Sequence, residues 1–144
     1  INKTNMATTT AAITLTSDLL SNNISVSAET TLFKTKSDST GLDQFDMGRI
    51  DIATGTNFDL LDAENTNNVN TANKVYICNE TEDETFYVQI TIDAQVIGRL
   101  YAGDWMFIPW GAEDATADIE IQAYGGTNTV TYAYFHEGRL LGSA

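Results

Sequence analysis

Residues 74–92 read KVYICNETEDETFYVQITI, and this stretch decides the fold class of the chain. Residues 74–79 and 86–92 are rich in β-branched and aromatic side chains, which is the composition of strands. Between these two runs, residues 80–84 are mostly acidic and are typical of a turn. Two strand-like runs joined by such a turn predict β-structure for the middle of the chain.

The same pattern continues downstream. Residues 96–100 and 105–108 are strand-like, with turn residues at 102–104 between them. Pro109 is the only proline of the chain, and we expect it to end the second run, where a ladder hydrogen bond would be lost.

The last predicted strands flank a pair of glycines. Residues 118–122 alternate apolar with polar side chains, and we expect them to pair with residues 129–135 as a hairpin. Gly125 and Gly126 lie between the two runs and suit a tight turn, because both can take positive φ at little cost.

Upstream of residue 74 the strand signals are shorter. They fall at residues 12–16, 24–27, 30–35 and 49–52, and the last ends at the turn signal Thr54-Gly55. Residues 58–64 are the one helix candidate. Strand-like runs that recur every eight to twelve residues or so predict an all-β chain, an antiparallel β-sandwich of jelly-roll-like form or a small barrel.

The length of 144 residues, or 15.7 kDa, fits one domain. We expect residues 1–12 to form a flexible N-terminal arm that gains order on docking, because this Thr- and Ala-rich stretch has no periodicity. The predicted β-sandwich domain is 13–137, and residues 138–144 form a C-terminal tail. Residues 65–73 contain five Asn and read as a polar spacer.

Charge and cysteine content exclude several classes of function. Seven basic residues against twenty acidic ones give a formal net charge of −13, so nucleic acids and anionic membranes are poor partners. Cys78 is the only cysteine, which leaves no intrachain disulfide and no zinc framework and fits a reducing cytoplasm. No uncharged apolar run approaches the roughly 18 residues of a membrane helix.

Candidate catalytic groups are few. The only histidine is His136, and a Cys78–His136 dyad would require the two strands to be neighbours. No nucleophile motif surrounds either residue, so we expect Cys78 to pack as a small apolar group and His136 to lie at a sheet edge. No Gly-rich phosphate loop is present, and we predict no enzyme activity and no cofactor.

The acidic residues fall mainly in predicted loops, where solvent keeps carboxylates at their ordinary pKa. This placement argues against a glycosidase pair, which needs one carboxyl held protonated by apolar surroundings. Calcium is the alternative use for the turn at residues 80–84, although the Asp-x-Asp-x-Asp-Gly pattern is missing. We predict no metal site.

The most distinctive segment is aromatic. Tyr101, Trp105, Phe107 and Trp110 lie within ten residues. Such side chains stack on sugars, or they fill a core or a subunit interface. Alternation places Trp105 and Phe107 on one face and the apolar Met106 and Ile108 on the other, which favours core and interface over an open sugar platform.

Turn residues surround this aromatic segment. Gly98, Arg99, Gly103, Asp104 and Pro109 are predicted to shape it. Arg99 and Asp104 flank the turn, and we expect them to form an ion pair that holds the corner at Gly103; the alternative is an exposed arginine.

The sequence resembles small virion structural proteins of marine tailed phages, especially cyanophages. The resemblance lies in residues 74–92, in IGRLYAGDWMFIPW at residues 97–110, and in the closing patterns at 118–121 and 130–137. Residues 13–20 and 39–42 fit less sharply, and the whole likeness covers roughly residues 11–137. No catalytic motif accompanies it.

The resemblance implies a non-enzymatic virion part present in many symmetric copies, such as a capsid decoration or cement subunit. Its expected partners are the major capsid protein and copies of itself, as a homo-oligomer, in a virion assembled in the bacterial host cytoplasm. The alternative is a carbohydrate- or receptor-binding β-sandwich module of a tail or head fibre.

Overall fold

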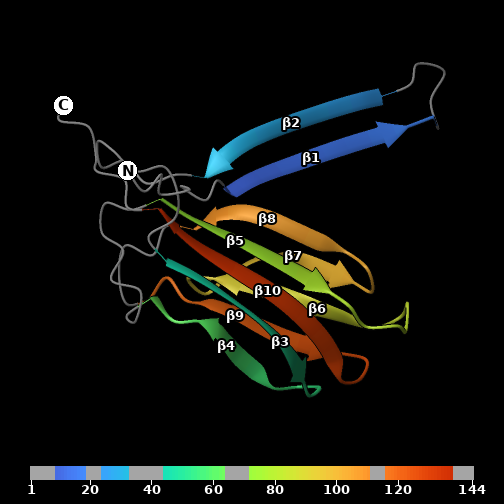
Figure 1. The fold of residues 1–144 in the computed structure, drawn as a ribbon. Helices are drawn as coiled ribbons and strands as arrows, with labels where there is room; N and C mark the ends of the chain where they lie inside the picture. Colours follow the sequence, from blue (N-terminus) through green and yellow to red (C-terminus); the bar gives the residue numbers. More distant parts are fainter. Residues whose placement is uncertain (1–8, 19–23, 33–43, 64–71, 111–115, 138–144) are drawn as a thin grey trace.

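A computed structural model describes residues 9–18, 24–32, 44–63, 72–110 and 116–137. The chain is all-β, as predicted, and its two larger sheets pack face to face as a sandwich (Figure 1). Ten strands are described: β1 (Thr9–Ser17), β2 (Ile24–Leu32), β3 (Gln44–Ile52), β4 (Asn57–Leu61), β5 (Ala72–Asn79), β6 (Tyr87–Ile92), β7 (Gln95–Tyr101), β8 (Trp105–Trp110), β9 (Ile119–Tyr124) and β10 (Asn128–Glu137). Among the described residues no helix is long and apolar enough to cross a membrane.

The strand order of the sandwich is that of a jelly roll. One sheet has the order β3-β10-β5-β8 and the other β4-β9-β6-β7, with every neighbouring pair antiparallel. From β3 to β10 the chain changes sheet at each connection except the β6–β7 hairpin. Two four-stranded sheets wound in this way correspond to the jelly-roll form of the predicted sandwich.

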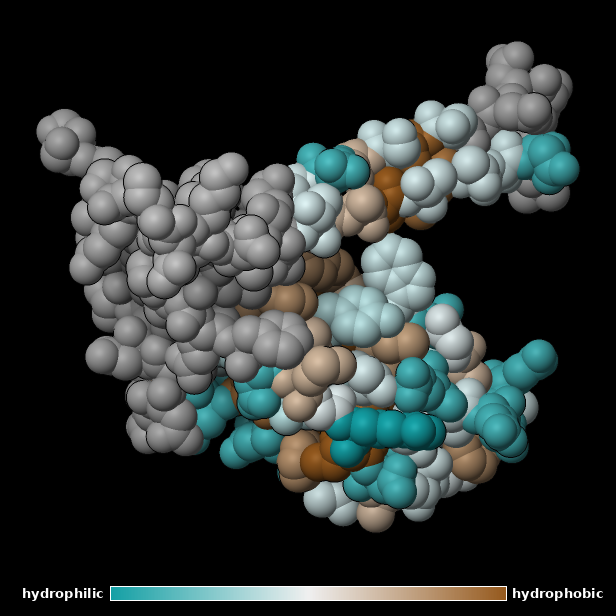
Figure 2. Space-filling view, viewed as in Figure 1, coloured by the Kyte–Doolittle hydropathy of each residue, from teal (hydrophilic) through white to brown (hydrophobic). Residues whose placement is uncertain are grey.

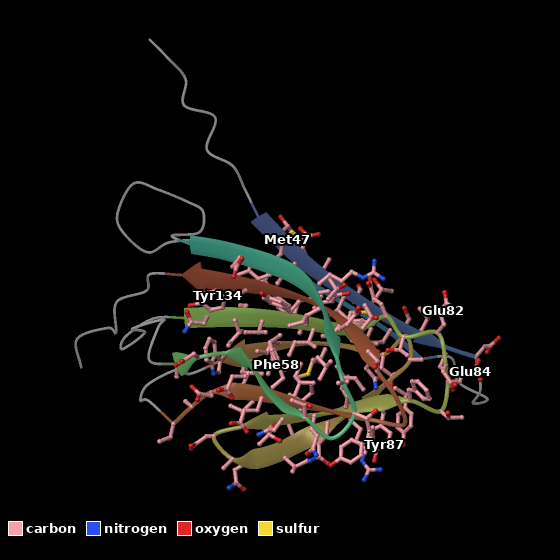
Figure 3. The ribbon with its side chains drawn as sticks, turned by 90° about the horizontal axis from the view of Figure 1, so that it is seen from below. Met47, Phe58, Glu82, Glu84, Tyr87 and Tyr134 are labelled. Atoms are coloured by element: carbon pink, nitrogen blue, oxygen red, sulfur yellow. The ribbon has the colours of Figure 1, made fainter. Side chains whose placement is uncertain are left out.

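The core lies between the two sheets, where strand alternation directs one side chain in two inward. Val75 and Ile77 of β5 are fully buried against the inward side chains of the facing sheet. Burying each such side chain contributes about 1.5–3 kcal/mol. The other members with almost no exposure are Val88, Ile90, Ile119, Ile121, Ala123 and Val130. Figure 3 shows Phe58 and Tyr134 reaching in among these side chains from the two sheets.

The predicted hairpin of residues 118–122 with 129–135 is wrong. β9 pairs with β4 and β6, whereas β10 pairs with β3 and β5, so the Gly125-Gly126 corner carries the chain between sheets. Gly125 has a φ of 90°, and a Cβ on Gly126 would lie 2.3 Å from the Phe86 ring. The glycines do allow a sharp turn, but a sharp turn does not determine which sheet the next strand joins.

Three further expectations are corrected. Residues 58–61 of the helix candidate belong to strand β4, because Phe58, Leu60 and Leu61 pack against the core from a sheet edge. Pro109 does not end its strand: β8 continues to Trp110, and it tolerates proline because it is an edge strand. Asn73, expected in a polar spacer, is buried in β5 and donates to the Trp110 carbonyl at 3.2 Å.

β1 and β2 form a separate two-stranded hairpin outside the sandwich. Strand β1 begins at Thr9, so residues 9–12 of the predicted arm belong to a strand, while residues 1–8 and the tail 138–144 lie outside the described part. Figure 1 shows the hairpin above β8 and diverging from the sandwich toward its tip. The predicted sandwich domain of residues 13–137 therefore contains a jelly roll from β3 onward and a hairpin that packs outside it.

Candidate interaction surface

An apolar face covers the outside of the β3-β10-β5-β8 sheet. The pairing register aligns Met47, Ala133, Tyr76 and Phe107 in one row across all four strands. Their inward neighbours fill the core, so alternation directs this row to the outside. Trp105 lies in the adjacent row, with its ring 6.5 Å from that of Tyr76. We call Met47, Tyr76, Trp105, Phe107, Ala133 and Phe135 the outer apolar face.

A cleft of about 590 Å³ lies between this face and the β1–β2 hairpin. Ala11, Ile13 and Ala28 line it from the hairpin, opposite the aromatic side chains of the sheet. Figure 2 shows the opening between the hairpin and the body of the molecule. Trp105 remains 46% exposed and Met47 59% exposed, so the molecule's own hairpin leaves the outer apolar face partly open to solvent.

The structure separates the four aromatic residues that the sequence singled out. Trp105 and Phe107 lie together on the outer apolar face. Trp110 is only 2% exposed: its Nε1 donates to the Ala117 carbonyl at 2.7 Å, and its ring meets Tyr134 edge-on. The expected alternation along this strand is confirmed, and Trp110 belongs to the core.

Other members of the face were not singled out from the sequence. Met47 comes from β3, Tyr76 from β5, and Ala133 and Phe135 from β10. Ile13 and Ala28 of the hairpin, which face them across the cleft, were not singled out either. Alternation within residues 74–79 was enough to assign Tyr76 and Val75 to opposite faces. The pairing of β5 with β8 and β10, which brings these residues together, has no local sequence signal.

Tyr101 belongs to a second aromatic group, on the outside of the β4-β9-β6-β7 sheet. The Tyr87 ring stacks on Tyr124 at a centroid distance of 4.8 Å and lies 5.0 Å from the Tyr101 ring. The Arg99 guanidinium lies 4.6 Å from the centroid of Tyr87. The next row of this sheet surface carries Gln89 opposite Gln122 and Arg99.

The expected Arg99–Asp104 ion pair is wrong. Both residues are described, and Arg99 points over Tyr87, where its side-chain hydrogen bond with Tyr101 raises its pKa. Asp104 instead accepts a hydrogen bond from the Tyr101 backbone N–H at 2.9 Å. The Gly103 corner, with a φ of 85°, is held by its N–H donating to the Asn79 carbonyl at 2.7 Å. Gly98 lies opposite Ile90, beside an irregular step in the β6–β7 pairing.

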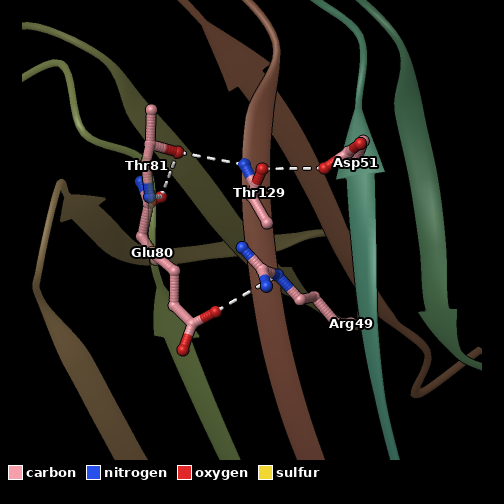
Figure 4. Close-up of polar contacts among 6 residues, drawn as sticks. Arg49, Asp51, Glu80, Thr81 and Thr129 are labelled. Atoms are coloured by element: carbon pink, nitrogen blue, oxygen red, sulfur yellow. Dashed lines mark hydrogen bonds and ion pairs between the residues drawn. The ribbon is translucent and has the colours of Figure 1, made fainter.

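The connection at residues 80–86 is held by its own polar contacts. Thr129 links two neighbouring strands: its N–H donates to Thr81 Oγ1 at 3.0 Å and its hydroxyl donates to Asp51 at 2.7 Å (Figure 4). The Arg49 guanidinium lies 3.4 Å from the Glu80 carboxylate. These contacts tie β3, β10 and the end of β5 together.

The acidic residues of this connection do not gather into a calcium site within the described structure. Asp83 accepts hydrogen bonds from the N–H and hydroxyl of Thr85 at 2.9 and 2.7 Å, which lower its pKa. Glu82 and Glu84 lie on the outside of the loop (Figure 3). The geometry therefore favours a solvated turn closed by its own side chains.

One group of three carboxylates does gather among the described residues. Oxygens of Asp59, Asp118 and Glu120 lie within 4.8 Å of one another at the β4 edge. Asp118 accepts from the Ala63 N–H at 2.7 Å and Glu120 from the Asn57 amide at 2.8 Å. Partial removal of the Asp59 carboxyl from water and the negative charge of nearby Glu120 both disfavour its charged form, and they raise the pKa of Asp59. Of the described side chains, these three are the set with a spacing that a hard cation would accept.

The Cys78–His136 dyad is excluded by the pairing register. β5 and β10 are neighbours, as the dyad requires, but Cys78 lies opposite Thr131 and His136 opposite Asn73. The two positions are five residues apart along the strands, or roughly 16 Å at about 3.3 Å per residue. Cys78 instead lies close to Tyr76. A hydrogen bond with the Cys78 side chain is the largest of the effects that raise the pKa of Tyr76.

Comparison with known proteins gives no relative for this chain. No protein-family model, no curated protein and no solved structure matches it.

Proposed function

We propose that this protein is a non-enzymatic structural subunit of a tailed-phage virion, a capsid decoration or cement protein that binds the exterior of the head through symmetric contacts. The observation that carries the proposal is the outer apolar face: a jelly roll with a filled core keeps Trp105 and Met47 half exposed on one sheet. An apolar patch on an otherwise acidic molecule is a surface suited to assembly.

The charge of the molecule fits this role. A net charge of −13 keeps the free subunit soluble before it assembles. Weak single contacts become tight when many copies bind a symmetric shell, because avidity multiplies them. The partners in this proposal are the major capsid protein and further copies of this chain, and the location is the virion assembled in the bacterial host cytoplasm.

The fold alone does not identify the function, because jelly rolls occur in viral capsid domains, lectins and cupins. The outer apolar face and the sequence resemblance to phage virion proteins support the proposed role. A cupin-type enzyme would need a reactive group inside the sandwich. The described interior is instead filled by aliphatic and aromatic side chains together with the buried amides of Asn73, Asn79 and Asn128.

The proposal is tested on heads of the parent phage prepared without this protein. We expect the purified chain to bind them saturably, at a copy number set by head symmetry, as seen by co-sedimentation and by electron microscopy. Met47→Ser with Trp105→Ser should weaken binding at least tenfold. The matched control is Val96→Ser with Ile97→Ser, two similarly exposed apolar residues on β7 that should change binding little. Heads that bind none of the wild-type chain contradict the proposal.

A carbohydrate- or receptor-binding module is the second candidate function. The observation in its favour is the row of Tyr124, Tyr87 and Tyr101 beside Gln89 and Gln122, since aromatic rings and amides are typical of sugar sites. Saturable binding on a glycan array that is lost in Tyr101→Ala would favour it. A Trp110→Ala variant is not informative here, because that ring is buried in the core.

A further inference from the structure

The β1–β2 hairpin has an apolar side that the molecule itself covers only in part. Alternation places Ala11, Ile13 and Leu15 on one side of β1, and the register places Ala28 opposite Ile13 and Val26 opposite Leu15. Leu15 is 51% exposed and Val26 is 50% exposed. A two-stranded hairpin is at best marginally stable in water, so this side needs a surface to pack on.

The outer apolar face is the matching surface, and it too remains partly exposed to solvent. Ile13 and Ala28 reach the cleft above Tyr76 and Phe107, but the Leu15–Val26 pair lies beyond the residues that line it. Met47 lies in the same cross-strand row as Tyr76 and Phe107, yet it is 59% exposed. Because the hairpin diverges from the sandwich toward its tip, packing within one chain leaves both surfaces half covered (Figure 1).

We infer that a second copy of this chain supplies the missing cover: the hairpin of each copy packs on the outer apolar face of the other. The two surfaces are complementary and belong to one chain, which is the condition for a two-fold interface made twice by the same residues. The inference assigns the outer apolar face to contacts between copies, so the loss of head binding expected for Met47→Ser with Trp105→Ser would act through loss of that assembly. It does not depend on the particle being a virion.

The distribution of charge permits this exchange. The chain carries a net charge of −13, which repels a second copy, but the described hairpin residues include only Asp18 and Glu29 as charged groups. The hairpin thus brings little negative charge to the contact, although Glu29 is among the residues that line the cleft.

The first test is the mass of the full chain in solution, measured by light scattering across a range of protein and salt concentrations. We expect an assembly of at least twice 15.7 kDa, strengthened by salt because salt screens the repulsion between acidic copies. Leu15→Ser with Val26→Ser should raise the dissociation constant at least tenfold. Val96→Ser with Ile97→Ser, the matched pair on β7, should leave it within about twofold. A chain that stays monomeric throughout, or equal weakening by both pairs, overturns the inference.

The second test locates the hairpin and needs no substitution. Carbon-13-labelled and unlabelled chains are mixed, unfolded together and refolded, and isotope-filtered NMR then detects contacts between different copies only. We expect cross-peaks from the Ile13 and Ala28 methyl groups to the Trp105 and Phe107 rings. An assembly that gives none of these cross-peaks between copies overturns the exchange, even where the mass is that of a dimer.

The outcomes separate this inference from the proposed function. A monomer that still decorates heads would overturn the exchange and leave the virion role standing. An exchanged dimer that binds no heads would overturn the virion role and leave the exchange standing.

Discussion

Two asparagine side chains, Asn79 and Asn128, are fully buried where β5, β7 and the β9–β10 corner meet. The Asn79 amide donates to the Leu100 carbonyl at 2.9 Å and to Asn128 Oδ1 at 3.0 Å. The Asn128 amide donates to the carbonyls of Tyr124 and Gly126 at 3.2 and 3.0 Å. Buried amides with all groups paired stabilise one arrangement of the chain, because any other arrangement leaves them unpaired.

Removal of one of these amides tests that account. We expect Asn128→Ala to lower the free energy of unfolding by about 2–3 kcal/mol, since it leaves several buried groups without a partner. Urea titration followed by circular dichroism measures the change. Asn57→Ala, at an exposed amide that donates to Glu120, is the control and should cost less than roughly 0.5 kcal/mol. Equal losses at the two positions would contradict the role given to the buried pair.

The carboxylate group at Asp59 gives stability a pH dependence of known sign. Asp59 has a raised pKa in the folded state, so the folded chain binds its proton more tightly than the unfolded chain does. The resulting loss of folding stability begins as the pH rises above 3.8, the ordinary pKa of the carboxyl. It is complete once the pH exceeds the raised pKa of the folded state. At pH 7 we therefore expect Asp59→Asn to stabilise the protein, by roughly 0.5 kcal/mol after solvent screening.

Thermal melts at several pH values measure this effect. The gain from Asp59→Asn should vanish below the ordinary carboxyl pKa, where both states are protonated. Asp83→Ala gives the opposite sign at pH 7, because hydrogen bonds from Thr85 lower the pKa of Asp83 and so stabilise its charged form. A gain from Asp59→Asn that is the same at all pH values would show that ionisation of Asp59 is not its cause.

At the scale of elements, β8 contributes a large side chain to each side of its sheet, the core side and the outer side. It is an edge strand, and its two tryptophans lie on opposite sides: Trp110 in the core and Trp105 on the outer apolar face. One short strand thus contributes one tryptophan to the core and the other to the outer apolar face. The pairing of β8 with β5 places Trp105 next to Tyr76, a residue about thirty positions earlier in the chain.

The two tryptophans of β8 should respond differently to truncation. We expect Trp110→Ala to lower the free energy of unfolding by about 3–5 kcal/mol, since it opens a cavity and removes the hydrogen bond to Ala117. Trp105→Ala should cost less than roughly 1 kcal/mol in the monomer. Denaturant titration at low protein concentration checks both values. A larger loss for Trp105 than for Trp110 would contradict their assignment to surface and core.

At the scale of the whole molecule, the hairpin and the jelly roll are separate units of one chain. All buried hydrophobic residues of the described core lie between Ile52 and Tyr134, within the strands from β3 onward and their connections. The described core therefore lies in the sandwich, and the hairpin contributes no side chain to it. This division is the physical basis for the proposal that the hairpin takes part in assembly.

Deletion of residues 1–32 tests that division. We expect the shortened chain to fold cooperatively, with its free energy of unfolding lowered by less than roughly 1 kcal/mol, because a half-exposed hairpin contributes little. The same deletion should abolish self-association. Differential scanning calorimetry and light scattering measure the two effects. Loss of the cooperative transition would show that the hairpin is an integral part of the fold.

The amino-acid sequence by itself determined the all-β class, most strand positions and the inward or outward direction of their side chains. These features depend on local composition and on the two-residue period of a strand, both of which are visible in a run such as residues 74–79. The spacing of the turns also predicted a sandwich or a small barrel.

Only the tertiary structure decided which strands pair, and hence which side chains meet. It placed β9 and β10 in different sheets, separated Trp110 from Trp105, and brought Tyr76, Phe107 and the hairpin together around one cleft. The physical reason is that non-local pairing is selected by the burial of a shared core. The two glycines at residues 125 and 126 permit a turn, but the apolar side chains on both sides of it determine where the chain goes next.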